Sequence, residues 1–283
     1  MPLSRAIAAH TERGGSWMLP EAKGGDLLYV STDNDGVYVF EYPSGIIAGN
    51  LNVFFSPEGL CSDSVGNVFI TDFVGHDIVE YAHGGDKPIK RLTDGSAFSP
   101  TDCAVDATTG NLAATQGDSS GVLIFRKAKG HPQEFFNSGG IMENCTYDPK
   151  GNLFTNNFYR HHTPLIGELP RGSSSFKNLK VDKFIKPLSG MRWDGKYLAV
   201  GGLFGDTVYQ VHVSSAAATI VGTTHLYGTK YVEWFWTAKD RVINADVASG
   251  VIGICDYPGG GSPLRTIEYV AAPHAVTLSL VSH

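Results

Sequence analysis

The sequence is poor in charge, in basic excess and in long apolar runs, and each scarcity excludes a class of protein. Only 18% of its 283 residues are charged, whereas 42% are hydrophobic and 11% aromatic, a balance that argues against intrinsic disorder. No stretch approaches the roughly 18 apolar residues of a membrane span. Lysine and arginine together number 22 against 28 acidic residues, so no nucleic-acid partner is expected.

Cysteine is also scarce, with four residues and no CxxC spacing, which is too few for a disulfide framework. Cys103 and Cys145 hold the same place in two sequence repeats, and Cys61 lies one residue away from that place. This regularity favours small buried strand residues over redox or metal chemistry.

What the sequence has in abundance is glycine, 34 residues, much of it in a repeated turn. Gly and Asn favour the positive φ of hairpin turns, and the turns recur about every 40 residues along the whole chain. They read GGD (24–26), DSVGN (63–67), DATTGN (106–111), DPKGN (148–152), DGK (194–196) and the degenerate TAKDR (237–241).

Each turn is followed by a short β-rich run, a polar loop, a second alternating run and a weaker edge strand. In one repeat these segments are VFITD (68–72), DIVEY (77–81) and PIKRLT (88–93). Four strands per unit at this period are typical of a propeller blade. We therefore predict an all-β, six-bladed β-propeller with four antiparallel strands per blade.

The two ends of the chain together supply one blade. The first unit begins at its second strand, DLLYV (26–30), and AVTLSLV (275–281) supplies the missing inner strand. The C-terminal strand is therefore predicted to complete the first blade and close the ring. We expect an N-terminal extension over 1–25 and a single, monomeric propeller domain over 26–283. The extension lacks the apolar run of a signal peptide, so an extracytoplasmic location is expected only if a leader has been removed.

Two sets of repeat positions converge on one mouth of the predicted channel, because inner strands begin there and second strands end there. Positions that serve only the fold would look alike in every blade, whereas these vary and are mostly polar, which indicates a site. The inner-strand set is Glu58, Thr101, Glu143, Ser189, Val232 and His274, and the second-strand set is Ser31, Asp72, Gln116, Asn157, Gly201 and Asp246.

Glu58, Glu143 and His274 are the leading candidates for a divalent-metal site with open positions, as Zn, Mn or Fe would accept. Oxygen from Asn144, Asn157 or Asp246 would instead complete a calcium site. The alternative is a mouth that is polar because water fills it.

Other candidates lie beside these positions. His161 and Asp246 are the first candidates for a general base, and Glu233 for an acid or base. Trp234 and Trp236 are expected to plug the channel or to pack between blades. The candidate substrate contacts are Asp72, His76, Gln116, Arg160 and His162.

The line TDCAVD (101–106), followed by GNL (110–112), resembles the inner-strand motif of the diisopropylfluorophosphatase, paraoxonase and gluconolactonase propellers. It also resembles the NHL-repeat propellers, and virginiamycin lyase belongs to the same wider group. The hydrolase resemblance implies a catalytic calcium held by Glu at the place of Glu58 and by Asn or Asp in three other blades. Glu58 matches directly and Glu143 offers an oxygen, whereas Thr101 and Ser189 depart from the pattern.

On these grounds we expect a metal-dependent hydrolase that acts on a small ester, lactone or phosphotriester at the axial mouth. The resemblance implies calcium as the cofactor, with zinc or manganese as alternatives. The NHL resemblance implies a different protein, a non-enzymatic propeller that binds a protein, peptide or glycan through its loop face. A lyase that uses His and Glu without hydrolysis is a third hypothesis.

Overall fold

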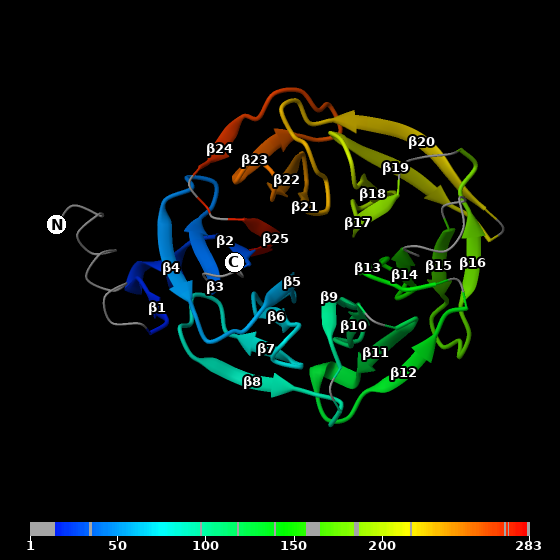
Figure 1. The fold of residues 1–283 in the computed structure, drawn as a ribbon, viewed down its shortest axis with the longest axis horizontal. Helices are drawn as coiled ribbons and strands as arrows, with labels where there is room; N and C mark the ends of the chain where they lie inside the picture. The colour runs from blue at the N-terminus through cyan, green and yellow to red at the C-terminus, as the bar shows by residue number, and fades with distance from the viewer. Residues whose placement is uncertain are drawn as a thin grey trace.

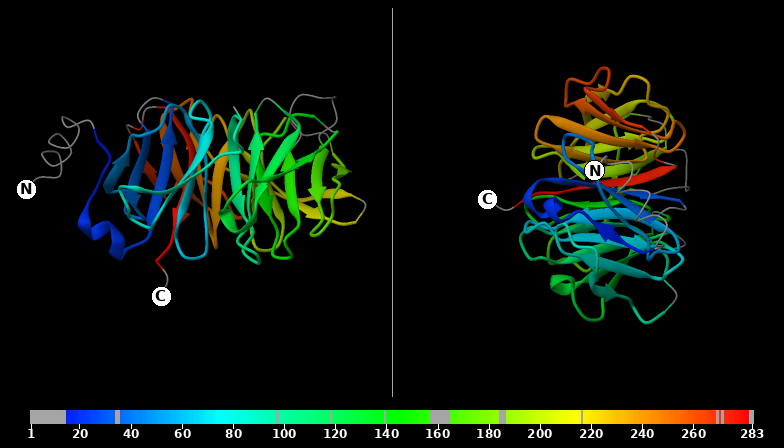
Figure 2. Two further views of the ribbon diagram at one scale, coloured as in Figure 1. Left: turned by 90° about the horizontal axis from the view of Figure 1, so that it is seen from below. Right: turned by 90° about the vertical axis from the view of Figure 1, so that its left-hand side faces the viewer.

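The computed structural model describes residues 15–33, 36–96, 98–117, 119–138, 140–156, 165–183, 187–215, 217–268, 270 and 272–281. Six antiparallel sheets stand around a central axis as the blades of a propeller (Figure 1). Seen edge-on, the ring is a flat disc (Figure 2). This confirms the predicted all-β, six-bladed propeller.

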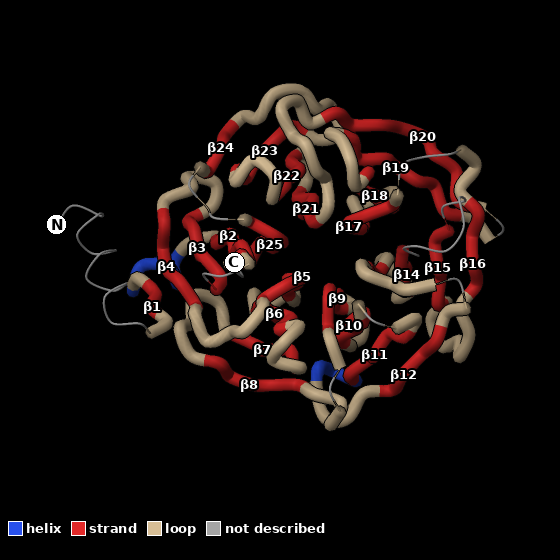
Figure 3. Tube along the Cα trace, in the orientation of Figure 1, coloured by secondary structure: helices blue, strands red, loops and turns tan. Residues whose placement is uncertain are grey.

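Regular structure in the described residues is almost entirely strand (Figure 3). The helices in these ranges are two short 3-10 segments, η1 (Pro20–Gly24) and η2 (Arg126–Ala128). Within the same ranges, no helix is long and apolar enough to cross a membrane.

Each blade has four strands, and the first strand of each lines the axis. Blade 1 consists of β25 (Pro273–Ser279), β2 (Leu27–Thr32), β3 (Gly36–Glu41) and β4 (Ile47–Leu51). Blade 2 consists of β5 (Pro57–Ser62), β6 (Val68–Asp72), β7 (Asp77–Tyr81) and β8 (Pro88–Leu92). Blade 3 consists of β9 (Pro100–Val105), β10 (Leu112–Gln116), β11 (Gly121–Phe125) and β12 (Gln133–Phe136). Blade 4 consists of β13 (Cys145–Tyr147), β14 (Leu153–Asn156), β15 (Leu165–Leu169) and β16 (Lys177–Lys180). Blade 5 consists of β17 (Leu188–Trp193), β18 (Leu198–Gly202), β19 (Thr207–Val213) and β20 (Ala218–His225). Blade 6 consists of β21 (Trp234–Ala238), β22 (Arg241–Asp246), β23 (Val251–Asp256) and β24 (Arg265–Ile267).

The ring closes as predicted, because β25 pairs antiparallel with β2 and places Val276 opposite Val30. These two buried valines also pack against Ile243 of blade 6, so the closing blade shares its core with its neighbour. The segment before the propeller adds β1 (Trp17–Met18) to the outer edge of blade 1, where it pairs with β4.

The repeated turns owe their shape to an aspartate and a glycine. The Asp63 carboxylate accepts hydrogen bonds from the backbone amides of Val65 and Asn67, and the Asn67 side chain donates to its second oxygen. Gly66 supplies the positive φ, +90°, that closes the turn. The turn at Asp148 repeats this arrangement. The repeat visible in the sequence is therefore a repeat of local hydrogen bonding.

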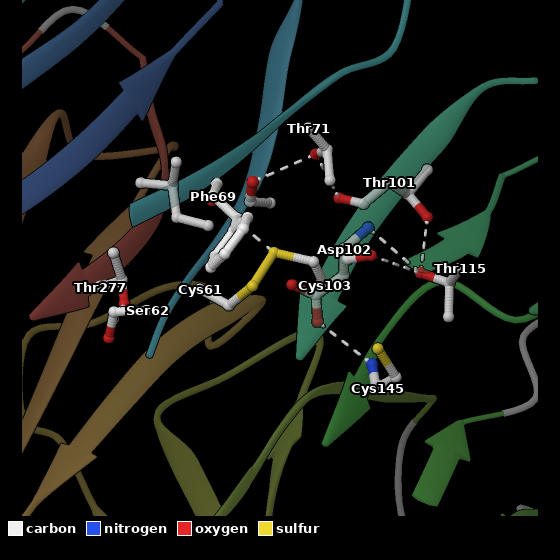
Figure 4. Close-up of a disulfide and its surroundings, with 12 residues drawn as sticks. Cys61, Ser62, Phe69, Thr71, Thr101, Asp102, Cys103, Thr115, Cys145 and Thr277 are labelled. Atoms are coloured by element: carbon white, nitrogen blue, oxygen red, sulfur yellow. Dashed lines mark hydrogen bonds between the residues drawn. A yellow bond between two sulfur atoms is a disulfide. The ribbon is translucent and has the colours of Figure 1, made fainter. Parts of the chain in front are cut away.

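The expectation that the repeat-related cysteines are unpaired is wrong for one pair. Cys61 of β5 and Cys103 of β9 form a disulfide between blades 2 and 3, with their Cα atoms 5.6 Å apart (Figure 4). The two cysteines are 42 residues apart in the sequence, which is one repeat, and from that regularity we expected both to be small buried packing residues. Inner strands of neighbouring blades lie side by side near the axis, so residues about one repeat apart can meet. Cys145 and Cys255 are free and buried.

Candidate acid–base site at the axial mouth

Four ionisable side chains converge at the axial mouth, the end of the channel where the inner strands begin. Glu58 and His274 are the second residues of β5 and β25, Glu233 directly precedes β21, and Glu143 lies two residues before β13. The Nδ1 atom of His274 lies 2.8 Å from Oε2 of Glu58. The alignment falls outside that of a hydrogen bond, so the contact is an ion pair. We call these four residues the mouth cluster.

The pKa values in the mouth cluster depend on one another. Burial, reinforced by the charges of Glu233 and Glu58, raises the pKa of Glu143 to about 7. Burial also raises the pKa of Glu233, although the His274 charge opposes it. Burial acts to lower the pKa of His274, but the Glu58 carboxylate, with help from Glu233 and Asp33, raises it above the ordinary value. Near neutral pH the cluster therefore holds both a proton donor and a group poised to accept one.

The carboxylates come from alternate blades, and hydroxyl groups of the intervening blades hold their backbones. Thr101 of blade 3 donates its hydroxyl to the carbonyl of Glu143 in blade 4, at 3.1 Å. Ser189 of blade 5 donates in the same way to the carbonyl of Glu233 in blade 6, at 3.1 Å. The hydroxyl of Ser31 in blade 1 donates to the carbonyl of Glu58 in blade 2.

This bracing corrects the register that we read in blade 6. The repeat alignment placed Val232 in the inner-strand set, whereas the contacts show that Glu233 takes the role held by Glu58 and Glu143. These bonds fix the backbone at each carboxylate, including Glu143 and Glu233, which lie in the segments just before β13 and β21.

Glycines allow the inner strands to approach closely beneath these residues. A Cβ on Gly59 would lie 2.5 Å from the Cα of Asp102 in the next blade, and one on Gly190 would lie 2.3 Å from the carbonyl oxygen of Glu233. Neither approach is possible for a larger residue without a backbone shift. The glycines that follow Glu58 and Ser189 thus set the spacing of the mouth.

Trp234 forms a wall of the mouth cluster. Its ring centroid is 4.3 Å from that of His274, and only 6% of its surface is exposed. Its indole Nε1 has no hydrogen-bond partner among the residues that the structure describes. The packing of Trp234 against imidazole and core agrees with the expectation that this tryptophan packs rather than projects.

Directly beneath the mouth, Arg192 of β17 reaches across the channel. Its guanidinium forms an ion pair with Asp102 of blade 3, with 3.2 Å between Nη1 and Oδ2, and donates to the carbonyls of Leu60 and Cys145 in blades 2 and 4. Asp102 also accepts from the amide of Cys145, and the guanidinium lies over the ring of Trp236 (Figure 4 shows the Asp102 side). One arginine therefore links five blades. We call these contacts, with the adjoining Cys61–Cys103 disulfide, the mid-channel layer.

Sequence reasoning missed Arg192. Its signal is a single charged residue in an otherwise apolar inner strand, LSGMRW (188–193), at a place where the other blades have no arginine. The pairing itself could not be read, because Arg192 and Asp102 are separated by 90 residues and by one whole blade.

Two predicted mouth residues at the ends of second strands hold loops in place. The buried Asp72 carboxylate accepts from the backbone amides of Phe55, Ser56 and Gly75. The buried Asp246 carboxylate accepts from the amides of Lys230 and Ala248 in the corresponding loops of blade 6.

Three further candidates also have partners within the blades. His76, at a positive φ of 58°, uses Nδ1 to donate to the carbonyl of Phe98. Gln116 donates to Glu134 on the outer strand β12. The Asn144 oxygen accepts from the Asn156 amide at 2.8 Å. The remaining candidates, Asn157, Arg160, His161 and His162, lie outside the described residues.

The fit of a divalent metal can be judged from the donor set. Across the described residues, no three His, Cys, Asp or Glu side chains are arranged to hold a metal ion. Glu58 forms an ion pair with His274, and the side-chain oxygen of Asn144 accepts a hydrogen bond from Asn156. A cation bound by Glu58, His274 or Asn144 would therefore replace one of these contacts.

Comparisons with known proteins agree on the fold. A chain of the nidogen/laminin complex superposes with a TM-score of 0.75 at 14% identity, covering 92% of this chain and all of that one. Streptogramin B lyase gives a TM-score of 0.57 at 13% identity, over 90% of this chain and 78% of its own. Virginiamycin B lyase from Staphylococcus aureus gives 0.60 at 12% identity, over 82% and 76%. At these identities the likeness shows the fold alone.

The sequence comparisons reach less of the chain. Peptidyl-glycine alpha-amidating monooxygenases A and B from Xenopus laevis are 37% identical over 76 residues, which is 23% of this chain. The match spans 8% of the length of either relative. No family model matches the sequence. Together the comparisons identify the chain as a six-bladed propeller whose structural neighbours include both enzymes and a protein crystallised in a complex.

Proposed function

We propose that this propeller is an enzyme whose mouth cluster performs acid–base chemistry on a small ester, lactone or phosphotriester. The observation that carries the proposal is the His274–Glu58 ion pair at the mouth, beside Glu143 with a pKa of about 7. Groups whose pKa lies near the working pH make efficient acid–base catalysts. The fold likeness to two lyases supports an enzymatic role only as far as architecture goes.

The residues divide the work by their surroundings. Ionised Glu143 accepts a proton from water or from the substrate. The His274 imidazolium, which Glu58 stabilises, donates to the leaving oxygen or to developing negative charge. Trp234 excludes water from one side of the imidazole. The exposed Asp33 and the partly buried Glu233 keep the mouth negative, which favours a neutral or cationic substrate over an anionic one.

The test is a screen of aryl esters, lactones and phosphotriesters with three variants, Glu143→Gln, His274→Gln and Glu58→Gln. General acid–base roles predict a fall in kcat/KM of about 10²–10⁴-fold for the first two. Glu268→Gln, an exposed substitution of the same kind in blade 6, is the matched control. Loss of activity in the control, or full activity in all three mouth variants, contradicts the proposal.

The reaction class is decided by a second readout. Reaction in ¹⁸O-labelled water incorporates the label into the acid or phosphate product if the enzyme hydrolyses its substrate. An elimination leaves the product unlabelled and creates a double bond, which mass spectrometry and ultraviolet absorbance detect.

A divalent cation remains a proposal for the same site, and the crowding of carboxylates favours it. The charges of Glu58 and Glu233 raise the pKa of Glu143, and that of Glu58 also raises the pKa of Glu233, so a bound cation would relieve this repulsion. A calcium, zinc or manganese ion would have to displace the His274 imidazolium from Glu58. Equilibrium dialysis with each metal, read as metal bound per chain at pH 6 and pH 8, tests this without reference to activity.

Binding of a protein, peptide or glycan is the second candidate function, and exposed aromatic side chains at the mouth face favour it. Phe55 is 78% exposed three residues before Glu58, and Phe204 is 50% exposed against Tyr231. The nidogen propeller, crystallised in a complex with laminin, has the same architecture. A binding module would keep its affinity in Glu143→Gln and lose it in Phe55→Ser or Phe204→Ser.

We also propose an extracytoplasmic location. The disulfide between Cys61 and Cys103 supports it, because such bonds persist in oxidising compartments.

A further inference from the structure

We infer a second binding site, separate from the mouth, for a small organic anion with an apolar or aromatic body. The site is a groove of about 460 Å³ between blades 3 and 4. Its walls include the turn that follows β9 and the segment that follows β11, which lie at the opposite end of the channel from the mouth. The volume is in the range of small-ligand sites.

Among the described residues, two arginines whose guanidinium groups make no hydrogen bond to another side chain line this groove, and the Arg171 charge acts on Asp106. The structure describes six arginines, and the side chains of four of them bond to a carboxylate or carbonyl. The guanidinium groups of Arg126 and Arg171 make no hydrogen bond or ion pair within 4 Å to any residue described, and both line the groove. The four bonded side chains are Arg91 with Asp77, Arg192 with Asp102, Arg241 with Asp256, and Arg265 with the carbonyl of Ser44.

Local contacts hold Arg171 at the groove. Its backbone amide donates to Asn152 Oδ1 at 3.0 Å. Its Cδ lies 3.3 Å from where a Cβ on Gly151 would be, as does Oδ2 of Asp106. The missing side chain of Gly151 thus lets the stem of Arg171 lie close to the backbone beside Asp106.

The charge balance of the groove is positive. Asp106 is the one carboxylate in its lining, and this group accepts hydrogen bonds from the hydroxyls of Thr108 and Thr109. Its single negative charge offsets one of the two guanidinium charges and leaves the lining positive. On a chain with a net charge of −6, this groove is a local exception. An anionic head group is the complement, and guanidinium binds carboxylate, phosphate or sulfonate oxygens in pairs.

The rest of the lining suits an apolar body. Ile124, Phe135 and Tyr147 belong to one packed cluster with Leu153 and Leu169, and all five side chains line the groove. An apolar ligand body against this wall and an anionic head between the arginines satisfy both parts of the lining at once. A purely inorganic anion would leave the apolar wall uncovered.

Two probes that differ in one group test the inference. 8-Anilinonaphthalene-1-sulfonate carries the anionic head, and N-phenyl-1-naphthylamine is the same aromatic body without it. We expect fluorescence titration of the full chain to show one site that binds the sulfonate at least about tenfold tighter than the neutral amine. Arg126→Gln/Arg171→Gln should abolish this preference, and sodium chloride should weaken it.

Lys87→Gln is the matched control, because Lys87 is an exposed cation just before β8, where blade 2 carries its equivalent turn. The control variant should keep the sulfonate preference within about twofold. Equal affinity for the two probes in the parent, no binding of the sulfonate, or a preference that survives in the double variant overturns the inference. Circular dichroism establishes that the variants are folded. Catalysis at the mouth is not needed for any of these outcomes.

Discussion

The mouth cluster and the mid-channel layer are a few residues apart along the same inner strands, yet they treat charge in opposite ways. In the mid-channel layer, Arg192 and Asp102 pair with each other and with backbone groups of several blades. At the mouth, three carboxylates share one imidazole, and burial together with the charges of Glu233 and Glu58 raises the pKa of Glu143 to about 7.

The contrast separates a structural use of charge from the catalytic use that we propose for the mouth. A buried ion pair that also bonds to the backbone of several blades holds those blades in one arrangement. Unbalanced carboxylates cost stability, and proteins tolerate that cost mainly at functional sites. The following experiments either sharpen this difference or remove it.

The largest effect is expected for Arg192→Met, which leaves the Asp102 carboxylate buried without its cation. Removing one partner of a buried pair costs about 3–5 kcal/mol of unfolding free energy. Urea denaturation measures the loss, and Arg192→Met/Asp102→Leu should recover much of it. Arg241→Met, which breaks ion pairs with the exposed carboxylates of Asp240 and Asp256, should cost under about 1 kcal/mol. An equally small loss of unfolding free energy for Arg192→Met would mean that the Arg192–Asp102 pair does not stabilise the fold.

The disulfide of the mid-channel layer should give the next largest effect. Cys61→Ala/Cys103→Ala is expected to lower the unfolding free energy by about 2–4 kcal/mol, because the cross-link restricts the unfolded chain. Thermal unfolding with and without a reductant provides the control. Reductant should lower the Tm of the parent and leave that of the double variant unchanged.

At the mouth, the change in unfolding free energy should have the opposite sign, so Glu143→Gln should stabilise the protein. The folded pKa of about 7 lies above the ordinary value of 4.5, so ionisation costs stability as pH rises from the lower value to the higher. The variant should therefore match the parent near pH 4 and exceed it by on the order of 1–3 kcal/mol at pH 8. Unfolding measured across this range is the test. A gain that does not depend on pH would assign the effect to packing.

The smallest effect is expected for Glu58→Gln, which removes the ion-pair partner of His274. The pKa of His274 should fall, because Glu58 is the main group that raises it. The ion pair stabilises the fold fully below the unfolded histidine pKa, near 6.5, and this contribution is lost as pH rises through the folded value. The variant should thus be less stable than the parent at pH 5.5 and closer to it at pH 9. Titration of the His274 ring protons by NMR gives the direct readout.

The turn chemistry and strand periodicity predicted the architecture down to the closing strand, since both are local properties. Asp63, Gly66 and Asn67 make their own turn through contacts within five residues. The same repeat count brought Glu58, Glu143 and His274 to one end of the channel. Glu233 was assigned one position out of register, because β21 departs from the motif of the other inner strands.

The partners of those residues could not be predicted in the same way. The sequence predicts Asp72 as a substrate contact and Asp246 as a general base or calcium ligand, whereas their bonds join residues 16 positions apart that meet only when the first and second strands of a blade pair. The Cys61–Cys103 pair depends on how the inner strands of neighbouring blades pack, and the reach of Arg192 depends on distances across the axis that the spacing of a repeat does not contain.

By itself, the sequence determined the six blades, their order and the face to which polar residues come, because hairpin turns and alternating strands depend on neighbours in the chain. Only the tertiary structure decided which charges are compensated. Ion pairing and pKa depend on burial and on distances of a few ångströms between different blades. Those distances place Arg192 against Asp102, and leave the mouth with more carboxylates than its one imidazole can neutralise.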